Sequence, residues 1–85
     1  MDPSPSSKRT FLLLGRPDCH LCEEFEQELV AEFGDRPIEL TRADVDSRAE
    51  WRRRFGRRIP VLLDEVGEVV CEAHVDAAAV ARVLG

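Results

Sequence analysis

Two cysteines stand where an apolar segment gives way to an amphipathic one, and this placement limits the possible folds more than any other feature of the chain. The apolar segment, Thr10–Leu14, is too short for a helix and is typical of a strand buried on both faces. From Cys19 to Phe33, apolar side chains recur every three or four residues, which predicts a helix with one buried face. Cys19 and Cys22 therefore lie in the first turn of that helix, where unpaired backbone N–H groups and the helix dipole stabilise a thiolate. The apolar positions of the helix are Leu21, Cys22, Phe25, Leu29, Val30 and Phe33.

The spacing of the two cysteines indicates disulfide chemistry. Residues three apart share a face of a helix, so Cys22 can form a disulfide with Cys19 and displace a molecule held there as a mixed disulfide. The chain has three cysteines in all, and this odd number argues against the disulfide framework of a small secreted protein. No charged and apolar leader precedes the first strand, so we expect a cytoplasmic protein. No apolar segment approaches the roughly 20 residues that span a bilayer, and we expect no membrane insertion.

Length, composition and charge indicate how the chain is divided into a tail and a domain, and which classes of partner it can bind. Residues 1–9 are rich in Ser and Pro and are expected to form a disordered tail, followed by one small domain over residues 10–85. A net charge of −5 argues against general affinity for nucleic acids. Residues 18–35 hold seven acidic side chains and no Lys or Arg, whereas residues 46–58 hold six Arg and two acids. These segments form either two solvated helix faces of opposite charge or, on the arginine side, a surface that binds an anion or a partner.

A second strand and a second helix follow the first helix. Residues 37–45 alternate partly between apolar and polar side chains, which predicts a strand more exposed than the first. Ser47 and Glu50 form a capping-box pattern, and this predicts a helix over residues 48–55. The chain therefore has a β-α-β-α order up to this point.

The C-terminal third predicts a hairpin and a last helix. Residues 60–63 and 68–72 are short apolar segments joined by a turn around Gly67, which is typical of an antiparallel hairpin. Asp76 is well placed to cap a helix over residues 77–84. Short loops and right-handed crossovers then predict an α/β domain of order β-α-β-α-β-β-α, with a four-stranded mixed sheet and helices on both faces.

This pattern resembles the thioredoxins and glutaredoxins. In those families a strand leads to a Cys-x-x-Cys pair that opens a helix, and a later Ile-Pro pair opens a strand, as Ile59-Pro60 does here. The resemblance covers residues 10–84, and the lack of a further strand and helix ahead of Thr10 makes the chain more similar to glutaredoxins. Within that group it resembles small bacterial glutaredoxin-like proteins in the segment Arg16-Pro17-Asp18-Cys19-His20-Leu21-Cys22.

The resemblance implies a thiol–disulfide oxidoreductase that uses no cofactor. Cys19 would be the attacking thiolate and Cys22 the resolving thiol. Ile59-Pro60 would be a cis peptide whose backbone pairs with an extended substrate. The expected partner is a disulfide-containing protein or a low-molecular-weight thiol, with glutathione or a thioredoxin reductase as the reductant, and the protein is expected to be a monomer.

The resemblance also implies residues for glutathione, together with one departure. Arg16 and Arg57 stand where glutaredoxins carry basic residues that bind the carboxylate of glutathione. Asp76 stands where an acidic residue meets the amino group of glutathione, although a helix cap is its simpler role. The glycine pair that leaves room for the glutathione backbone is replaced by Ala73-His74-Val75, so we expect weak glutathione binding.

Three charged or titratable side chains bear on the Cys19 thiolate. Asp18 opposes thiolate formation because its negative charge is adjacent. His20, if protonated, would lower the pKa of Cys19, or it is an exposed bystander. His74, at the end of the fourth strand, either lies over the Cys19 thiol or is a surface histidine.

Two other functions are compatible with the sequence. Cys19, Cys22, Cys71 and His74 have the ligand types and pair spacings of a zinc site, or of a bridged iron–sulfur cluster, although Cys71 is also expected in the core. Alternatively the domain is a non-catalytic redox switch that docks through its arginine-rich helix.

Overall fold

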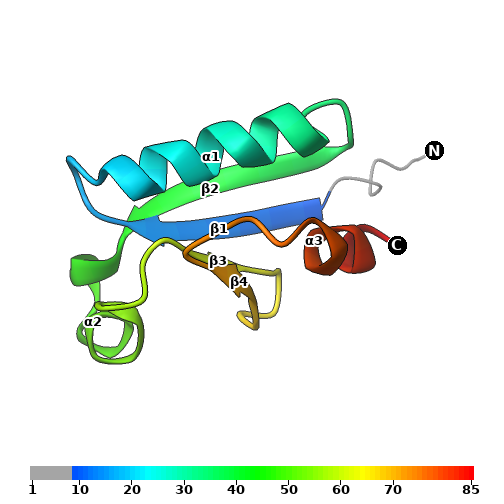
Figure 1. The fold of residues 1–85 in the computed structure, drawn as a ribbon. Helices are drawn as coiled ribbons and strands as arrows, with labels where there is room; N and C mark the ends of the chain where they lie inside the picture. The colour runs from blue at the N-terminus through cyan, green and yellow to red at the C-terminus, as the bar shows by residue number, and fades with distance from the viewer. Residues whose placement is uncertain (1–8) are drawn as a thin grey trace.

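The computed structural model describes residues 9–85 and contains three α-helices around a four-stranded sheet (Figure 1). The order is the predicted β-α-β-α-β-β-α, with one additional 3₁₀ turn ahead of the second helix. The first strand begins at Arg9, one residue before the expected domain boundary, and the rest of the expected tail lies outside the described residues. The elements are β1 (Arg9–Gly15), α1 (His20–Phe33), β2 (Ile38–Asp44), η2 (Val45–Ser47), α2 (Ala49–Phe55), β3 (Val61–Leu63), β4 (Val69–Glu72) and α3 (Ala77–Leu84).

The sheet is mixed, as predicted, with the strand order β2-β1-β3-β4. β1 pairs with β2 in parallel and with β3 antiparallel, and β3 pairs antiparallel with β4. Parallel neighbours need a long crossover, which α1 supplies, whereas β3 and β4 are joined by a tight turn. In that turn Asp64 Oδ1 accepts the N–H groups of Val66 and Glu68 at 3.0 and 2.9 Å. Gly67 adopts a φ of +87°, which a residue with a side chain rarely does.

Each face of the sheet has its own hydrophobic core because side chains alternate along β1. Phe11 and Leu13 face α1 and α3, whereas Leu14 faces α2. α1 and α2 lie on opposite sides of the sheet (Figure 1), so helices cover both faces as predicted. The core beside α1 and α3 comprises Phe11, Leu13, Phe25, Leu29, Phe33, Leu62, Cys71 and Val80; the core beside α2 comprises Leu14, Val45, Phe55, Val61 and Leu63.

Two details of the helices differ from the prediction. Leu21 and Val30 were expected on the buried face of α1 but are each 53% exposed, because that face is a single narrow stripe. Ser47 does not cap α2: its hydroxyl donates to the Asp44 carbonyl at 2.6 Å within η2. Asp44 is the N-cap of η2, so Ser47 belongs to this turn and not to the start of α2. α2 begins after Arg48 and has no side-chain cap.

Candidate redox site

The N-terminus of α1 holds a disulfide between Cys19 and Cys22, whose Cα atoms are 5.2 Å apart. Cys19 is the N-cap residue, and its Sγ accepts the backbone N–H of Cys22 at 3.2 Å. A hydrogen bond from a helix-terminal N–H stabilises negative charge on sulfur. The same geometry therefore favours a Cys19 thiolate once the pair is reduced.

The two cysteines differ in access to solvent, and Gly15 contributes to that difference. Cys22 is only 9% exposed, whereas Cys19 is half-buried. A Cβ atom built on Gly15 would lie 2.8 Å from Cys22 Sγ, closer than real side chains approach. The absence of a side chain at the end of β1 thus lets the Cys22 sulfur pack directly against the strand.

The end of β1 also aligns the disulfide with the segment that precedes β3. Leu14 pairs with Val61, so Gly15 lies opposite Pro60 in the antiparallel register. The Ile59–Pro60 peptide bond is cis, and the buried Pro60 directs its carbonyl to the N–H of Ala73 at 2.8 Å. The register therefore brings the Ile-Pro segment and the exit of β4 to the sheet end that carries the disulfide.

Arg16 is held by an internal carboxylate. Its Nε donates to Asp46 Oδ2 at 2.8 Å and its Nη2 to Asp46 Oδ1 at 3.1 Å, a bidentate pair. Its Nη1 donates to the Gly56 carbonyl at 2.9 Å. The hydrogen bonds from Arg16 lower the pKa of Asp46, and the charge of Arg52 adds to this shift. Arg16, which the resemblance implies for binding the carboxylate of glutathione, is thus already bound to the carboxylate of Asp46.

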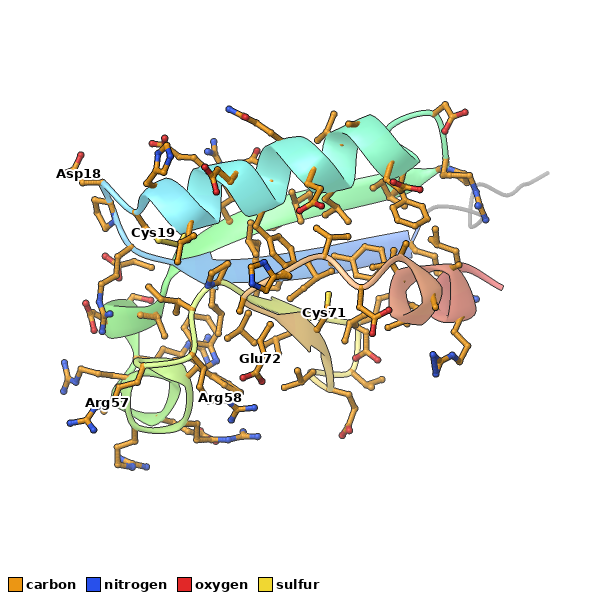
Figure 2. The ribbon with its side chains drawn as sticks, viewed as in Figure 1. Asp18, Cys19, Arg57, Arg58, Cys71 and Glu72 are labelled. Atoms are coloured by element: carbon orange, nitrogen blue, oxygen red, sulfur yellow. A yellow bond between two sulfur atoms is a disulfide. The ribbon has the colours of Figure 1, made fainter. Side chains whose placement is uncertain are left out.

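Arg57 and Arg58 precede the cis bond but have different surroundings. Arg58 donates from Nε to both carboxylate oxygens of Glu72, at 3.0 and 3.1 Å, and its Nη2 also pairs with Glu72. These hydrogen bonds lower the pKa of Glu72. Arg57 is exposed, makes no ion pair within residues 9–85, and points away from the protein (Figure 2).

Sequence reasoning missed Asp46, Glu72 and the role of Gly15. A signal for Asp46 was present: β1 and β2 are parallel neighbours, so the residues that follow them, Arg16 and Asp46, meet at one sheet end. Glu72 could have been found from the hairpin, because the end of β4 returns to the start of β3. The contact between Gly15 and Cys22 has no sequence signal, since it depends on how closely α1 approaches β1.

The remaining candidate residues lie around this core. His20 Nε2 pairs with Glu24 Oε2 at 2.9 Å along the exposed face of α1. Asp76 caps α3, accepting the N–H of Ala79 at 3.2 Å, as the sequence predicts. His74 is exposed, and its imidazole makes no hydrogen bond or ion pair within residues 9–85. Ala73, in place of an expected glycine, adopts a φ of +70°.

Comparisons with known proteins identify the family. The sequence profile described as "Glutaredoxin-like domain (DUF836)" matches residues 10–85. The chain belongs to this family. A solution NMR structure of a protein from Nitrosomonas europaea is similar over 100% of both chains, with 26% identity and a TM-score of 0.84. An X-ray structure of a protein from X. campestris is similar over 87% of this chain and 93% of the other, with 28% identity and a TM-score of 0.64. None of the curated proteins compared matches this chain.

In this glutaredoxin-like domain a groove of about 710 Å³ opens beside the disulfide, between α1 and β2. Both cysteines line it, together with Gly15 at the end of β1. Its charged lining is mostly acidic, and Arg42 within it is paired with Glu26 at 3.3 Å. The acidic side chains that line the groove are Asp18, Glu23, Glu26 and Asp44.

Cys71, the third cysteine, is buried in the core beside α1 and α3, as expected. Burial raises the pKa of its thiol. Within residues 9–85, no three His, Cys, Asp or Glu side chains gather as metal ligands would, so the four residues of the zinc alternative are not brought together. Over the same residues, no helix is both long and apolar enough to cross a membrane.

Proposed function

We propose that this glutaredoxin-like domain is a thiol–disulfide oxidoreductase in which Cys19 attacks a substrate disulfide and Cys22 resolves the mixed disulfide. The unequal placement of the two sulfurs supports this most directly. Cys19 Sγ stands at the N-cap and accepts a backbone N–H, whereas Cys22 is buried behind it against Gly15. A nucleophile needs access and a stabilised thiolate, but a resolving thiol needs only to reach its neighbour.

The reaction transfers two electrons from the protein dithiol to the substrate. The Cys19 thiolate attacks one substrate sulfur; the substrate S–S bond breaks as the mixed disulfide forms, and the departing thiolate takes up a proton. Cys22 then loses its proton and attacks Cys19 Sγ, which releases the second substrate thiol. This leaves the Cys19–Cys22 disulfide, which a thiol reductant such as glutathione or the dithiol of a thioredoxin reductase must reduce again.

The substrate that fits the surroundings better is a protein disulfide rather than glutathione. Arg16 directs three of its donors to Asp46 and Gly56, so a ligand carboxylate would have to compete with an internal one. Ala73 and His74 stand where the resemblance to glutaredoxins implies a glycine pair that leaves room for the glutathione backbone. We expect slow reduction of a glutathione mixed disulfide compared with a peptide disulfide.

The test is the asymmetry between the two cysteines. Cys19→Ser should abolish reduction of a peptide disulfide, because the nucleophile is lost. Cys22→Ser should accumulate the peptide as a mixed disulfide on Cys19, visible by mass spectrometry. Cys71→Ser, a buried residue outside the site, serves as the control and should retain activity. Alkylation at acidic pH that modifies Cys22 before Cys19 would reverse the assigned roles.

A further inference from the structure

Three arginines of α2 and the turn after it form no ion pair within residues 9–85. We call these side chains, Arg52, Arg53 and Arg57, the arginine patch; all three are exposed. Their neighbours are engaged: Arg54 pairs with Glu50 at 3.4 Å, and Arg58 with Glu72. The Arg48 guanidinium lies 4.7 Å from the centre of the Trp51 ring. The patch is therefore the part of the arginine-rich segment that makes no side-chain hydrogen bond, ion pair or cation–π contact within residues 9–85.

The patch is connected to the redox site through Arg16. The Gly56 carbonyl, directly before Arg57, accepts a hydrogen bond from Arg16 Nη1 at 2.9 Å. Arg16 lies three residues before Cys19, and its bidentate partner Asp46 lies within reach of the Arg52 charge. The cis Ile59–Pro60 bond follows the patch and aligns with the end of β1. A partner that covers the patch would thus lie at the same end of the sheet as Cys19.

The opposite approach to the disulfide carries the opposite charge. No Lys or Arg occurs in residues 18–35, and the α1/β2 groove is mostly acidic because its two arginines, Arg16 and Arg42, are each paired with a carboxylate. Figure 2 shows the two labelled ends of this arrangement, with Asp18 beside α1 and Arg57 beside α2, on either side of Cys19. An acidic molecule is repelled from the α1 side and attracted to the α2 side, so the charge distribution fixes its orientation at the disulfide.

We infer that the arginine patch docks an acidic segment of the protein whose disulfide exchanges with Cys19. The inference depends on the proposed function, because it names a class of substrate for that site. Arginine is enriched in protein interfaces whereas Glu and Asp are depleted, which favours the patch over the acidic groove as the docking surface. A nucleic acid fits less well, because its extended phosphate charge would meet the acidic α1 and a chain of net charge −5.

The experiment uses three synthetic peptides that contain the same internal disulfide and differ only in the residues beside it. One peptide carries glutamates, one glutamines and one lysines. The rate of reduction by the reduced protein is measured in a single turnover at low and high salt. Binding is measured separately by fluorescence anisotropy with the oxidised protein, using peptides in which Ser replaces Cys, so that docking is tested without the chemistry.

The variant Arg52→Glu/Arg53→Glu inverts the patch and leaves the cysteines and Arg57 in place. Its matched control is Arg36→Glu/Arg82→Glu, which changes the net charge equally at two exposed positions outside the patch. Because glutamates near the C-terminus of α2 oppose its dipole, Arg52→Gln/Arg53→Gln is the second test variant. All variants should reduce hydroxyethyl disulfide, a small neutral substrate, at the wild-type rate.

We expect the glutamate peptide to bind and react about tenfold better than the glutamine peptide at low salt, and this preference to shrink at high salt. The patch variants should lose the preference and the control should keep it. Equal rates for the three peptides, a preference for the lysine peptide, or an equal loss in the control would overturn the inference. A single-stranded oligonucleotide that displaces the glutamate peptide at equal charge would also overturn it, in favour of general polyanion binding. Failure to reduce any disulfide would instead refute the proposed function, and anisotropy would still test the docking.

Discussion

The two faces of the sheet attach their helices in different ways. α1 has 14 residues and buries four side chains: Cys22, Phe25, Leu29 and Phe33. α2 has 7 residues and buries one, Phe55, with Trp51 packed against the same core. Four buried side chains hold the longer helix, whereas the shorter helix has one buried side chain, Phe55, and one partly buried aromatic neighbour, Trp51.

The α2 side compensates with polar contacts that cross between elements. Arg16, in the loop before α1, binds Asp46 in η2 and the Gly56 carbonyl at the end of α2. Arg58, after α2, binds Glu72 at the end of β4. The cysteines are therefore positioned by apolar packing, and the segments around them by ion pairs that salt and pH can weaken.

The largest expected effect comes from removing one buried aromatic side chain from each face. Phe25→Ala and Phe55→Ala should each destabilise the protein by about 3–5 kcal/mol, as large-to-small core substitutions do. Phe55 is the only side chain that α2 buries, so Phe55→Ala should also let α2 open by itself. Hydrogen exchange should then show unprotected α2 amides in Phe55→Ala, while α1 amides stay protected up to global unfolding in Phe25→Ala.

The contrast between the two variants is the informative result. Local exchange of α1 in Phe25→Ala would show that its other three buried side chains do not hold the helix. Exchange of α2 only by global unfolding in Phe55→Ala would show that the ion pairs fix α2 without its buried side chain. Either outcome would mean that the two helices are attached to the sheet in the same way.

The sequence patterns that predicted the fold correctly are those with a local period. The apolar segment of β1, the three-and-four spacing of apolar residues between Cys19 and Phe33, and the turn at Gly67 each specify an element by themselves. The position of the cysteines at the start of α1 follows from the same local patterns. This is why both the architecture and the dithiol could be read without a structure.

The contacts that the sequence did not reveal join residues far apart in the chain. Arg16 and Asp46 are 30 residues apart, so no local pattern links them. Ser47 had the pattern of a helix cap, but Asp44, three residues earlier, competed for the same turn. Leu21 is an apolar residue at a helical spacing, but its exposure depends on which face of α1 packs against the sheet.

Gly15→Ala tests how closely α1 packs on the sheet at the dithiol. A Cβ at this position would lie 2.8 Å from Cys22 Sγ, so the sulfur or the helix must move. In the reduced protein we expect a destabilisation of about 1–3 kcal/mol, as overpacking produces. The measurement is denaturant unfolding under reducing conditions, so that loss of the disulfide does not contribute.

A double-mutant cycle identifies the cause of that loss. In a Cys22→Ala background the sulfur is absent, and Gly15→Ala should then cost less than about 1 kcal/mol. An equal cost in both backgrounds would mean that Gly15 is needed for its backbone rather than for its contact with Cys22.

Ala73→Gly should stabilise the protein, although glycine usually destabilises. Ala73 adopts a φ of +70°, which glycine tolerates better than alanine. We expect a gain of about 0.5–1 kcal/mol in the free energy of unfolding. The same substitution at Ala81, an exposed position within α3, is the control and should cost about 1 kcal/mol. A loss at both positions would mean that the backbone at Ala73 is unstrained.

The smallest effect is expected from acid, and it should be confined to the polar contacts of the α2 side. Hydrogen bonds from Arg16 and Arg58 hold the pKa values of Asp46 and Glu72 below their ordinary values. A carboxylate whose pKa is lowered on folding stabilises the protein above its unfolded pKa, and this stabilisation is lost as the pH falls through the folded pKa. The stability of the wild type should therefore decline between roughly pH 5 and pH 2, more steeply than that of Asp46→Asn/Glu72→Gln.

Salt separates this electrostatic effect from a change in packing. Both ion pairs are exposed, so 1 M salt, with a screening length of about 3 Å, should bring the unfolding curves of the wild type and the double variant closer together at pH 7. The two proteins should also converge at the acid end, where the carboxylates of the wild type are protonated. If the difference between them persisted in acid and in salt, the substitutions would have altered packing at η2 or β4. The α2 side would then be held mainly by packing, as the α1 side is. The two faces would differ only in how much apolar surface their helices bury.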